Sequence, residues 1–561
     1  MPYPAGINIT VNKWAGVVPL DEKEKVDPPF DHDPSKVQIL RPYTTNHEHS
    51  QQSSDAILGN RYKLLATTPN LNQGCIRARI NTIPPQEPGY LQWYRRMEPK
   101  KSHVWRFLGI DEAIRTSLYP YHVRPDFLTA LTYFWNPRVN CFCFPRGMMG
   151  PNMLDVGMIA RLPVTWMNPA TQPLITKPKL NTSYKSWSGF IRSHVGTEEI
   201  TDTEHTAFLL YWLSHYIIWP RSKKPSPHLL GLATWLAQGH RASVGSLFLA
   251  ELYHGINTYV EAIKTHNVTD LTLTGPMWFL EVWARLFFSL GVPDRLAYPK
   301  NPPFSPPAAI RIMQATKHDL PLSELFNRIL LDNREDKEFF IYAGAMYMAD
   351  SPLWGDPAML PTYLGTNRAD GNLAAWDSII RPRCLFTSLI WDQHKTKIRP
   401  EIYMPHCLAR QLGCCQGFPG LLPTAMIPDT DDLGFIPPKE AVALSRAMDN
   451  YVFGRTQVPF RLTACALTDL DKWWGRLWSE LQYSTTDLIF RLGLTVDDVI
   501  EPQPDFANPL VPTRSQPKRK STMQSSNSPK KLRTNSDDQA SGSGSQSSHE
   551  SPIIMLFAWF F

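Results

Sequence analysis

The spacing of apolar residues changes from a helical to a strand-like period within one short stretch of the chain. Phe127, Leu131 and Phe134 recur at helical spacing, which predicts a helix with one apolar face. Pro137 ends that helix, because the residue before a proline is driven out of the helical region of backbone space. Residues 140–144 then alternate with a period of two, which predicts a short strand. On that strand Phe142 and Phe144 share one face, and Cys141 and Cys143 share the other.

A turn and a second helix follow this strand. Pro145 fixes its own φ and Gly147 is free to adopt a positive φ, which together predict a tight turn. Asn152 is a predicted N-cap, and the apolar residues after it recur at helical spacing until Pro163. The pattern therefore predicts a helix, a β-hairpin at about residues 140–151 and a second helix.

Most of the remaining pattern is also helical. Apolar residues three and four positions apart predict amphipathic helices over much of the chain. We therefore predict a mainly α protein, in which one large helical domain, residues 91–501, contains the single small hairpin. The segments with a helical period are 205–218, 239–257, 275–288, 323–331, 439–455 and 466–493.

The two ends of the chain and one internal loop lack this pattern. Residues 1–90 mix prolines with a polar run, and we predict an irregular lead segment there. Residues 502–561 hold too little apolar surface to offset chain entropy, so we predict a disordered tail. Residues 293–307 hold six prolines, which excludes a helix. That loop is either an internal domain boundary or a stiff surface excursion within one domain, and we favour the second.

The order of these motifs resembles the plant mobile domain family, whose members are often labelled aminotransferase-like. Its members share a helix, a hairpin of the form W-x-P-x-x-x-x-F-x-F-P-x-G, and a second helix that contains L-x-D-V and ends in L-P-V; this chain has Leu-Asp-Val without the intervening residue. Further blocks fit in the same order, including Arg-Gln-x-Gly, and the resemblance spans roughly residues 90–500. The matching residues are Trp135, Pro137, Phe142, Phe144, Pro145, Gly147, Leu154, Asp155, Val156, Leu162, Pro163, Val164, Arg410, Gln411 and Gly413.

The resemblance implies a domain that transposable elements share with host genes. Host members are linked to transposon silencing, genome stability and developmental gene expression, and some relatives act with serine/threonine phosphatase-like proteins of the PP7 type. The Asp/His/Asn metal motifs of such a phosphatase are absent from this sequence, so a phosphatase is expected only as a separate partner. The matching motif residues are expected to be structural.

Charge separates the tail from the rest of the chain. The whole chain holds 57 Lys+Arg and 51 Asp+Glu, a net charge of +6. From Thr513 onward there are seven basic and three acidic residues, so that part carries +4 and residues 1–512 carry +2. A body so nearly balanced lacks the overall charge of a dedicated nucleic-acid binder, although a local basic face stays open as an alternative.

The sequence holds no strong catalytic signature. It lacks a nucleophile elbow, a phosphate-binding loop, an H-E-x-x-H zinc motif and a dinucleotide-binding turn. Pyridoxal chemistry needs a reactive lysine in an α/β scaffold, which a mainly helical chain does not offer. We therefore predict a protein that is not an enzyme and that requires no cofactor and no metal.

Two weaker constellations point to metal chemistry. One is a zinc shell, in which Cys141 and Cys143 join a second group of ligands; buried apolar thiols are the favoured alternative. The other is a nuclease-like cluster of carboxylates, although Asp155 is equally explained by its place in the first turn of a helix. The second ligand group is His406, Cys407, Cys414 and Cys415, and the carboxylates are Asp155, Asp392 and Glu401.

The tail carries two basic clusters, which we call the tail clusters. Exposed basic residues in a disordered segment suit capture by the acidic grooves of a nuclear import receptor, and the alternative is a solvated charge run. We predict a nuclear protein whose partners are an import receptor and other nuclear proteins. No apolar run is long enough to span a bilayer, so no membrane partner is expected. The tail clusters are Lys518, Arg519 and Lys520, and Lys530, Lys531 and Arg533.

Three functions fit the sequence, and each predicts a different surface. A protein-interaction scaffold, the favoured function, predicts an exposed apolar or aromatic patch. A nucleic-acid-binding module of transposon origin predicts a basic groove. A cryptic enzyme predicts titratable groups that converge near the hairpin.

Overall fold

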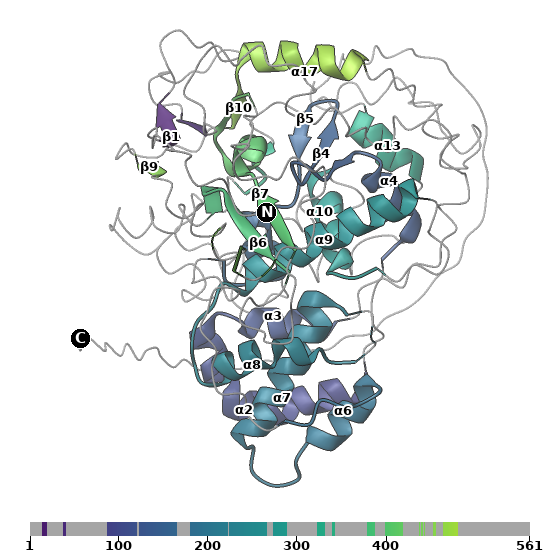
Figure 1. Ribbon diagram of the computed structural model, residues 1–561, viewed down its shortest axis with the longest axis vertical. Helices are drawn as coiled ribbons and strands as arrows, with labels where there is room; N and C mark the ends of the chain where they lie inside the picture. Colours follow the sequence, from purple (N-terminus) through teal and green to yellow (C-terminus); the bar gives the residue numbers. More distant parts are fainter. Residues whose placement is uncertain are drawn as a thin grey trace, which may run out of the picture. The chain divides into compact units, whose positions relative to one another are not determined.

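In the computed structural model, the chain divides into two units, Met1–Pro502 and Gln503–Phe561. All residues that the structure describes lie in the first unit (Figure 1). The tail clusters and the proline-rich loop 293–307 lie outside the described residues. The described residues are 14–19, 38–40, 87–119, 123–164, 180–220, 222, 224–265, 273–288, 322–330, 339–342, 379–387, 399–418, 437, 439–440, 443, 453–455 and 464–480.

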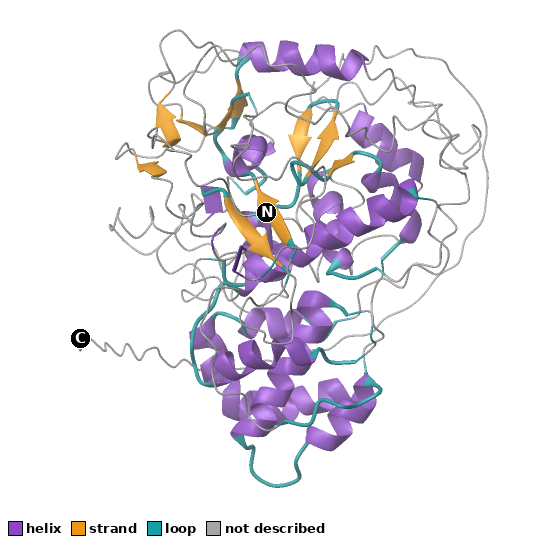
Figure 2. Cartoon of the chain, in the orientation of Figure 1, coloured by secondary structure: helices purple, strands orange, loops and turns teal. Residues whose placement is uncertain are grey.

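Helices dominate the described residues, which confirms the predicted mainly α fold (Figure 2). None of the described helices is both long and apolar enough to cross a membrane. The helices are α2 (Pro88–Leu108), α3 (Asp111–Thr116), α4 (Pro125–Thr132), α6 (Trp187–His194), α7 (Asp202–Trp212), α8 (Leu230–Ala237), α9 (Val244–Lys264), α10 (Met277–Phe287), α13 (Leu322–Leu330) and α17 (Thr468–Glu480).

The predicted hairpin forms, and a third strand joins it. β4 (Cys141–Phe144) pairs antiparallel with β5 (Gly147–Met149) across the turn. β3 (Trp135–Asn136) pairs with the other edge of β4, where Trp135 lies opposite Phe142. Every residue of the three strands is buried, so both faces of this small sheet belong to the core.

The second helix begins where the sequence predicts and ends earlier. Asn152 caps α5 (Met153–Asp155), which continues as a π-helical turn, Val156–Ala160. Arg161 adopts a left-handed φ of 58°, so the helix stops before Pro163, the predicted end. α9 begins at Val244 rather than at Gly239; Gly239 itself has a positive φ of 84° and is not helical.

Two further sheets accompany the predicted hairpin. A two-stranded sheet pairs β6 (Arg383–Phe386) with β7 (Pro400–Tyr403), and a five-stranded sheet has the order β10-β8-β2-β1-β9. Two strands of the larger sheet come from residues 1–90, where the sequence suggests irregular structure. Neither β1 (Trp-Ala-Gly-Val-Val-Pro) nor β2 (Gln-Ile-Leu) alternates polar and apolar residues with a period of two. The five strands are β1 (Trp14–Pro19), β2 (Gln38–Leu40), β8 (Cys415–Gln416), β9 (Phe453–Arg455) and β10 (Cys465–Ala466).

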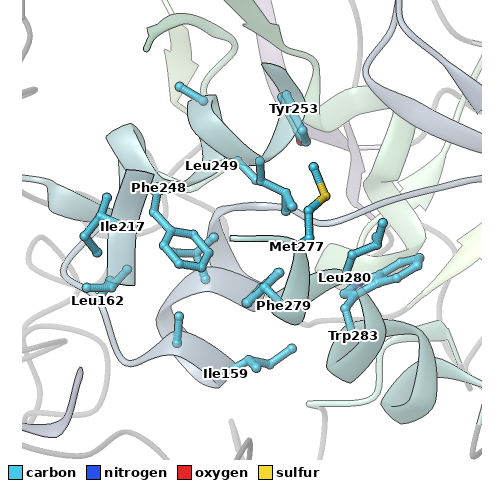
Figure 3. Close-up of a cluster of buried hydrophobic side chains, with 14 of the residues drawn as sticks. Ile159, Leu162, Ile217, Phe248, Leu249, Tyr253, Met277, Phe279, Leu280 and Trp283 are labelled. Atoms are coloured by element: carbon cyan, nitrogen blue, oxygen red, sulfur yellow. The ribbon is translucent and has the colours of Figure 1, made fainter. Parts of the chain in front are cut away.

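A buried apolar cluster joins α9 and α10 to the segment after the hairpin (Figure 3). Two glycines permit this close packing. A Cβ at Gly255 would overlap the backbone oxygen of Thr274, and a Cβ at Gly275 would overlap that of Glu251. Each large apolar side chain in the cluster stabilises the fold by about 1.5–3 kcal/mol relative to exposure. Its labelled members are Ile159, Leu162, Ile217, Phe248, Leu249, Tyr253, Met277, Phe279, Leu280 and Trp283.

Two buried tryptophans attach α2 to α7. Trp93 Nε1 donates to Glu204 Oε1 at 3.2 Å, and Trp105 Nε1 donates to His205 Nε2 at 3.0 Å. Burial lowers the pKa of His205 to about 3, so its ring is neutral and accepts this hydrogen bond at physiological pH. Glu204 also pairs with Arg96 at 2.9 Å. These contacts determine which face of α2 is buried and which is exposed.

Candidate functional site

Two family-motif blocks that are distant in sequence lie against each other. The hairpin contacts a 3-10 helix, Pro405–Leu412, through Gln411. The backbone N of Gly150 donates to Gln411 Oε1 at 2.8 Å, and Gln411 Nε2 donates to the backbone O of Gly150 at 3.2 Å. Because both bonds reach the backbone of one residue, the Gln411 side chain pairs with the N–H and C=O groups of Gly150 as the backbone of a neighbouring strand would. We call Gly147, Gly150, Arg410 and Gln411 the motif joint.

Arg410 forms the other half of the motif joint. Its Nη2 donates to the backbone O of Arg146, and its Cζ lies 4.3 Å from the centroid of the Phe339 ring. Gly147 has a positive φ of 122°, and a Cβ there would overlap Arg410 Nη2. Glycine at this position therefore serves both the turn and the close approach of the arginine. Gly413, with φ of 70°, ends the helix that carries Arg410.

Asp155 lies fully buried at the start of the second helix. Its Oδ2 accepts from the backbone N of Asn152 at 3.0 Å and from Trp283 Nε1 at 3.2 Å. Its Oδ1 accepts from the Tyr342 hydroxyl at 2.8 Å. Burial raises the pKa of Asp155 to about 7, although these hydrogen bonds oppose the shift. This motif aspartate thus connects a capping box to α10 and to the segment 339–342.

A second buried polar network connects β3 and the turn before β4 to α9 and β7. Trp135 Nε1 donates to Asn257 Oδ1 at 2.7 Å. Asn257 Nδ2 donates to Asn140 Oδ1 at 3.0 Å and to Glu401 Oε2 at 2.9 Å. Asn140 Nδ2 donates in turn to the backbone O of Ile402 at 3.0 Å. One asparagine on a mainly apolar helix thus joins three separate segments.

Glu401 is the point at which this network approaches the surface. Its Oε1 lies 3.1 Å from Arg399 Nε and 3.6 Å from His254 Nδ1. Glu401 is 3% exposed, whereas the Arg399 and His254 side chains are 20% and 21% exposed. Titratable groups do therefore converge near the hairpin, but the carboxylate itself is held by an ion pair with Arg399 and by hydrogen bonds.

The structure brings some of the candidate metal ligands together: Cys141 shares a side-chain hydrogen bond with Cys143, and both thiols lie near Cys407. Within the part of the chain that the structure describes, no group of three His, Cys, Asp or Glu side chains is arranged to hold a metal ion. Asp155 and Glu401 take part in different networks, and Asp392 lies outside the described residues. The described cysteines are free and buried, and burial raises the pKa of the Cys141 and Cys407 thiols. These thiols are therefore neutral and unsuited to nucleophilic attack.

The other motif residues contribute to packing. Phe142 stacks on Phe144 at 5.3 Å between ring centroids, and Leu162 is fully buried. The backbone O of Pro163 accepts from Gly245 N at 2.9 Å, which ties the end of the motif to the start of α9. Pro137 and Pro145 lie half-buried in the turns that flank β4.

Sequence reasoning missed the residues that connect these motifs. Asn140 and Asn257 gave no motif signal, although a lone asparagine within an apolar helical stripe is a warning of a buried polar contact. The sequence also gives no sign that Trp474 of α17 contacts the hairpin, where its Nε1 donates to the backbone O of Phe144 at 2.8 Å. Each of these partners lies more than one hundred residues from the group it binds.

These features define a large helical domain assembled around a buried three-stranded sheet and fastened by internal polar contacts. The chain belongs to the plant mobile domain family, because the model of that domain matches residues 109–433, more than half of its 561 residues. No curated protein and no solved structure matches the chain. Membership relates it to transposon-associated proteins.

Proposed function

We propose that this chain is a non-enzymatic nuclear protein that acts as a protein-interaction scaffold. Its family places it among transposon-related proteins. The processes we propose are transposon silencing, genome stability or developmental gene regulation, either as a host protein or as a transposon-encoded relative. A separate phosphatase-like protein of the PP7 type is the first partner to seek.

The observation that best supports a scaffold is the direction of the motif's polar side chains. Gln411 and Arg410 bind the backbone of the hairpin, and Asp155 accepts three hydrogen bonds from within the fold. A catalytic acid or base must reach a substrate, whereas these groups are buried and already bonded. The motif therefore serves the rigidity of the fold, which leaves function to the surface.

The exposed aromatic residues indicate where on the folded part of the chain a protein partner would bind. Among the described residues, the large hydrophobic side chains that are exposed are Phe107, at 53%, and Tyr119, at 39%. They flank α3 on its two sides along the chain, at the end of α2 and after α3. Exposed aromatic side chains are typical anchors of protein interfaces.

Nuclear location rests on the tail clusters. Exposed lysines and arginines complement the acidic grooves of an import receptor. The partner would then meet the folded domain in the nucleus, where silencing complexes act.

Affinity purification from nuclear extract tests the scaffold. The tagged full-length chain is compared with a Phe107→Ala/Tyr119→Ala variant, and with a Leu91→Ala/Tyr184→Ala control, which truncates two half-buried residues instead. Each sample is purified with and without nuclease, and partners are identified by mass spectrometry. We expect partners that survive nuclease, that persist with the control and that diminish in the aromatic variant. Partners that all vanish with nuclease would overturn the scaffold.

A further inference from the structure

We infer that the exposed face of α2 binds the phosphate backbone of a nucleic acid. α2 carries five fixed positive charges and one acidic residue, Glu98, a net of +4 within 21 residues. Residues 1–512 carry only +2 in total, so basic charge is concentrated on this helix. α2 ends at Leu108, before the family match begins at residue 109, so this helix lies outside the part of the chain that matches the family. The five are Arg95, Arg96, Lys100, Lys101 and Arg106.

The exposed basic residues share one side of the helix. Arg95, Lys100, His103 and Arg106 are all exposed. At about 100° per residue, they fall within an arc of about 140°. Glu98 lies off that arc, where it accepts a hydrogen bond from the Tyr94 hydroxyl at 2.7 Å. The exposed arc therefore carries positive charge and no carboxylate.

Two of the five charges are already used within the protein. Arg96 pairs with Glu204 at 2.9 Å, and Lys101 pairs with Asp202 at 3.2 Å. Arg106 Nε lies 4.0 Å from Asp111 Oδ2, at the limit of an ion pair, and its side chain remains 58% exposed. Among the residues that the structure describes, none forms an ion pair with Arg95 or Lys100, so these two and Arg106 are the charges that remain to meet phosphates.

An aromatic ring marks the C-terminal end of this face. Phe107 is 53% exposed. Arg241, from the loop before α9, places its Cζ 4.1 Å from the ring centroid and donates through Nε to the backbone O of Phe107 at 2.9 Å. The ring is thus held in place, with a further guanidinium over one of its two faces. A fixed aromatic ring among cations is the arrangement on which nucleic-acid bases stack.

The dimensions and composition favour a nucleic acid over other anionic partners. From Arg95 to Arg106 the helix rises about 16 Å. One strand of a duplex presents about five phosphates over that length. A membrane-binding helix would need a broad exposed apolar face, whereas Phe107 is the large apolar residue exposed on α2.

Salt-dependent binding tests this inference. The full-length chain, with all six tail-cluster residues changed to glutamine in every sample, is titrated against fluorescently labelled single-stranded RNA, single-stranded DNA and duplex DNA. The test variant is Arg95→Gln/Lys100→Gln/Arg106→Gln. The control variant, Arg192→Gln/Arg328→Gln/Lys472→Gln, removes three exposed charges from α6, α13 and α17. Circular dichroism checks that both variants keep the helical content of the parent.

We expect the test variant to bind at least about tenfold more weakly at low salt, and its salt slope to fall by about two for single strands, because three phosphate contacts are lost. The control should bind like the parent. Equal binding by test variant and parent would overturn the inference, as would equal losses in test and control. The parent is also titrated against anionic phosphatidylserine vesicles and against polyglutamate. Binding of the parent to these two alone would also overturn the inference. Both proposals use Phe107, but the scaffold is tested separately, because it concerns partners that survive nuclease.

Discussion

Replacing Gly147 by alanine tests the motif joint, because the added Cβ destabilises the fold in two independent ways. Gly147 has φ of 122°, a conformation that costs an L-residue about 1–3 kcal/mol. The new Cβ would also overlap Arg410 Nη2, which donates to the backbone O of Arg146. Losing a hydrogen bond from a charged group costs about 1.5–3 kcal/mol. We therefore expect Gly147→Ala to lower the free energy of unfolding by about 2.5–6 kcal/mol.

Gly239→Ala is the matched control for this substitution. Gly239 also has a positive φ, 84°, but a Cβ there would meet nothing within 4 Å. Only the backbone cost of about 1–3 kcal/mol is expected. Urea unfolding followed by tryptophan fluorescence compares the two variants with the parent. Equal destabilisation by both, or no effect of Gly147→Ala, would refute the role assigned to Arg410.

Two further predictions concern a buried carboxyl and the tail. Burial raises the pKa of Asp155 from 3.8 to about 7, so between these values the folded state holds a proton that the unfolded state releases. The free energy of unfolding should therefore fall as pH rises through this window, by at most about 1.4 kcal/mol per pH unit. In urea titrations, Asp155→Asn should make the free energy of unfolding depend less on pH. An unchanged pH dependence would contradict the raised pKa of Asp155. Changing all six tail-cluster residues to alanine should move a fluorescently tagged chain out of the nucleus, and unchanged nuclear accumulation by microscopy would refute the import signal.

The hairpin and the presence of a helix on each side of it could be predicted because their signals are local. The first helix, however, ends at Thr132, before the predicted end at Pro137, because Trp135 and Asn136 form β3. A proline, a glycine and a period of two determine the turn and strands around β4, and Asn152 lies three residues before the Asp155 with which it forms the capping box. The end of the second helix could not be predicted in the same way. Arg161 adopts a left-handed conformation that neither its own residue type nor its neighbours announce.

The polar contacts of the site could not be predicted, because they depend on residues that folding brings together. Gln411 belongs to a family motif, but its hydrogen bonds to Gly150 span 261 positions of the chain. Asn257 shows only as a polar residue on an apolar helix, and its contact with Glu401 spans 144. A period along the chain reports which face of an element is buried; it does not report which buried polar groups meet.

The family motif fastens the hairpin to the distant helix Pro405–Leu412 through the motif joint. Hydrogen–deuterium exchange measured by mass spectrometry on a peptide that covers Gly150 tests it most directly, because the Gly150 N–H donates to Gln411. In Gln411→Ala, we predict that this amide exchanges at least about tenfold faster, since a protecting bond worth roughly 1.4 kcal/mol or more is lost. Peptides from α7 should exchange as in the parent. Unchanged protection at Gly150 would contradict the claim that the motif joint holds these two segments together.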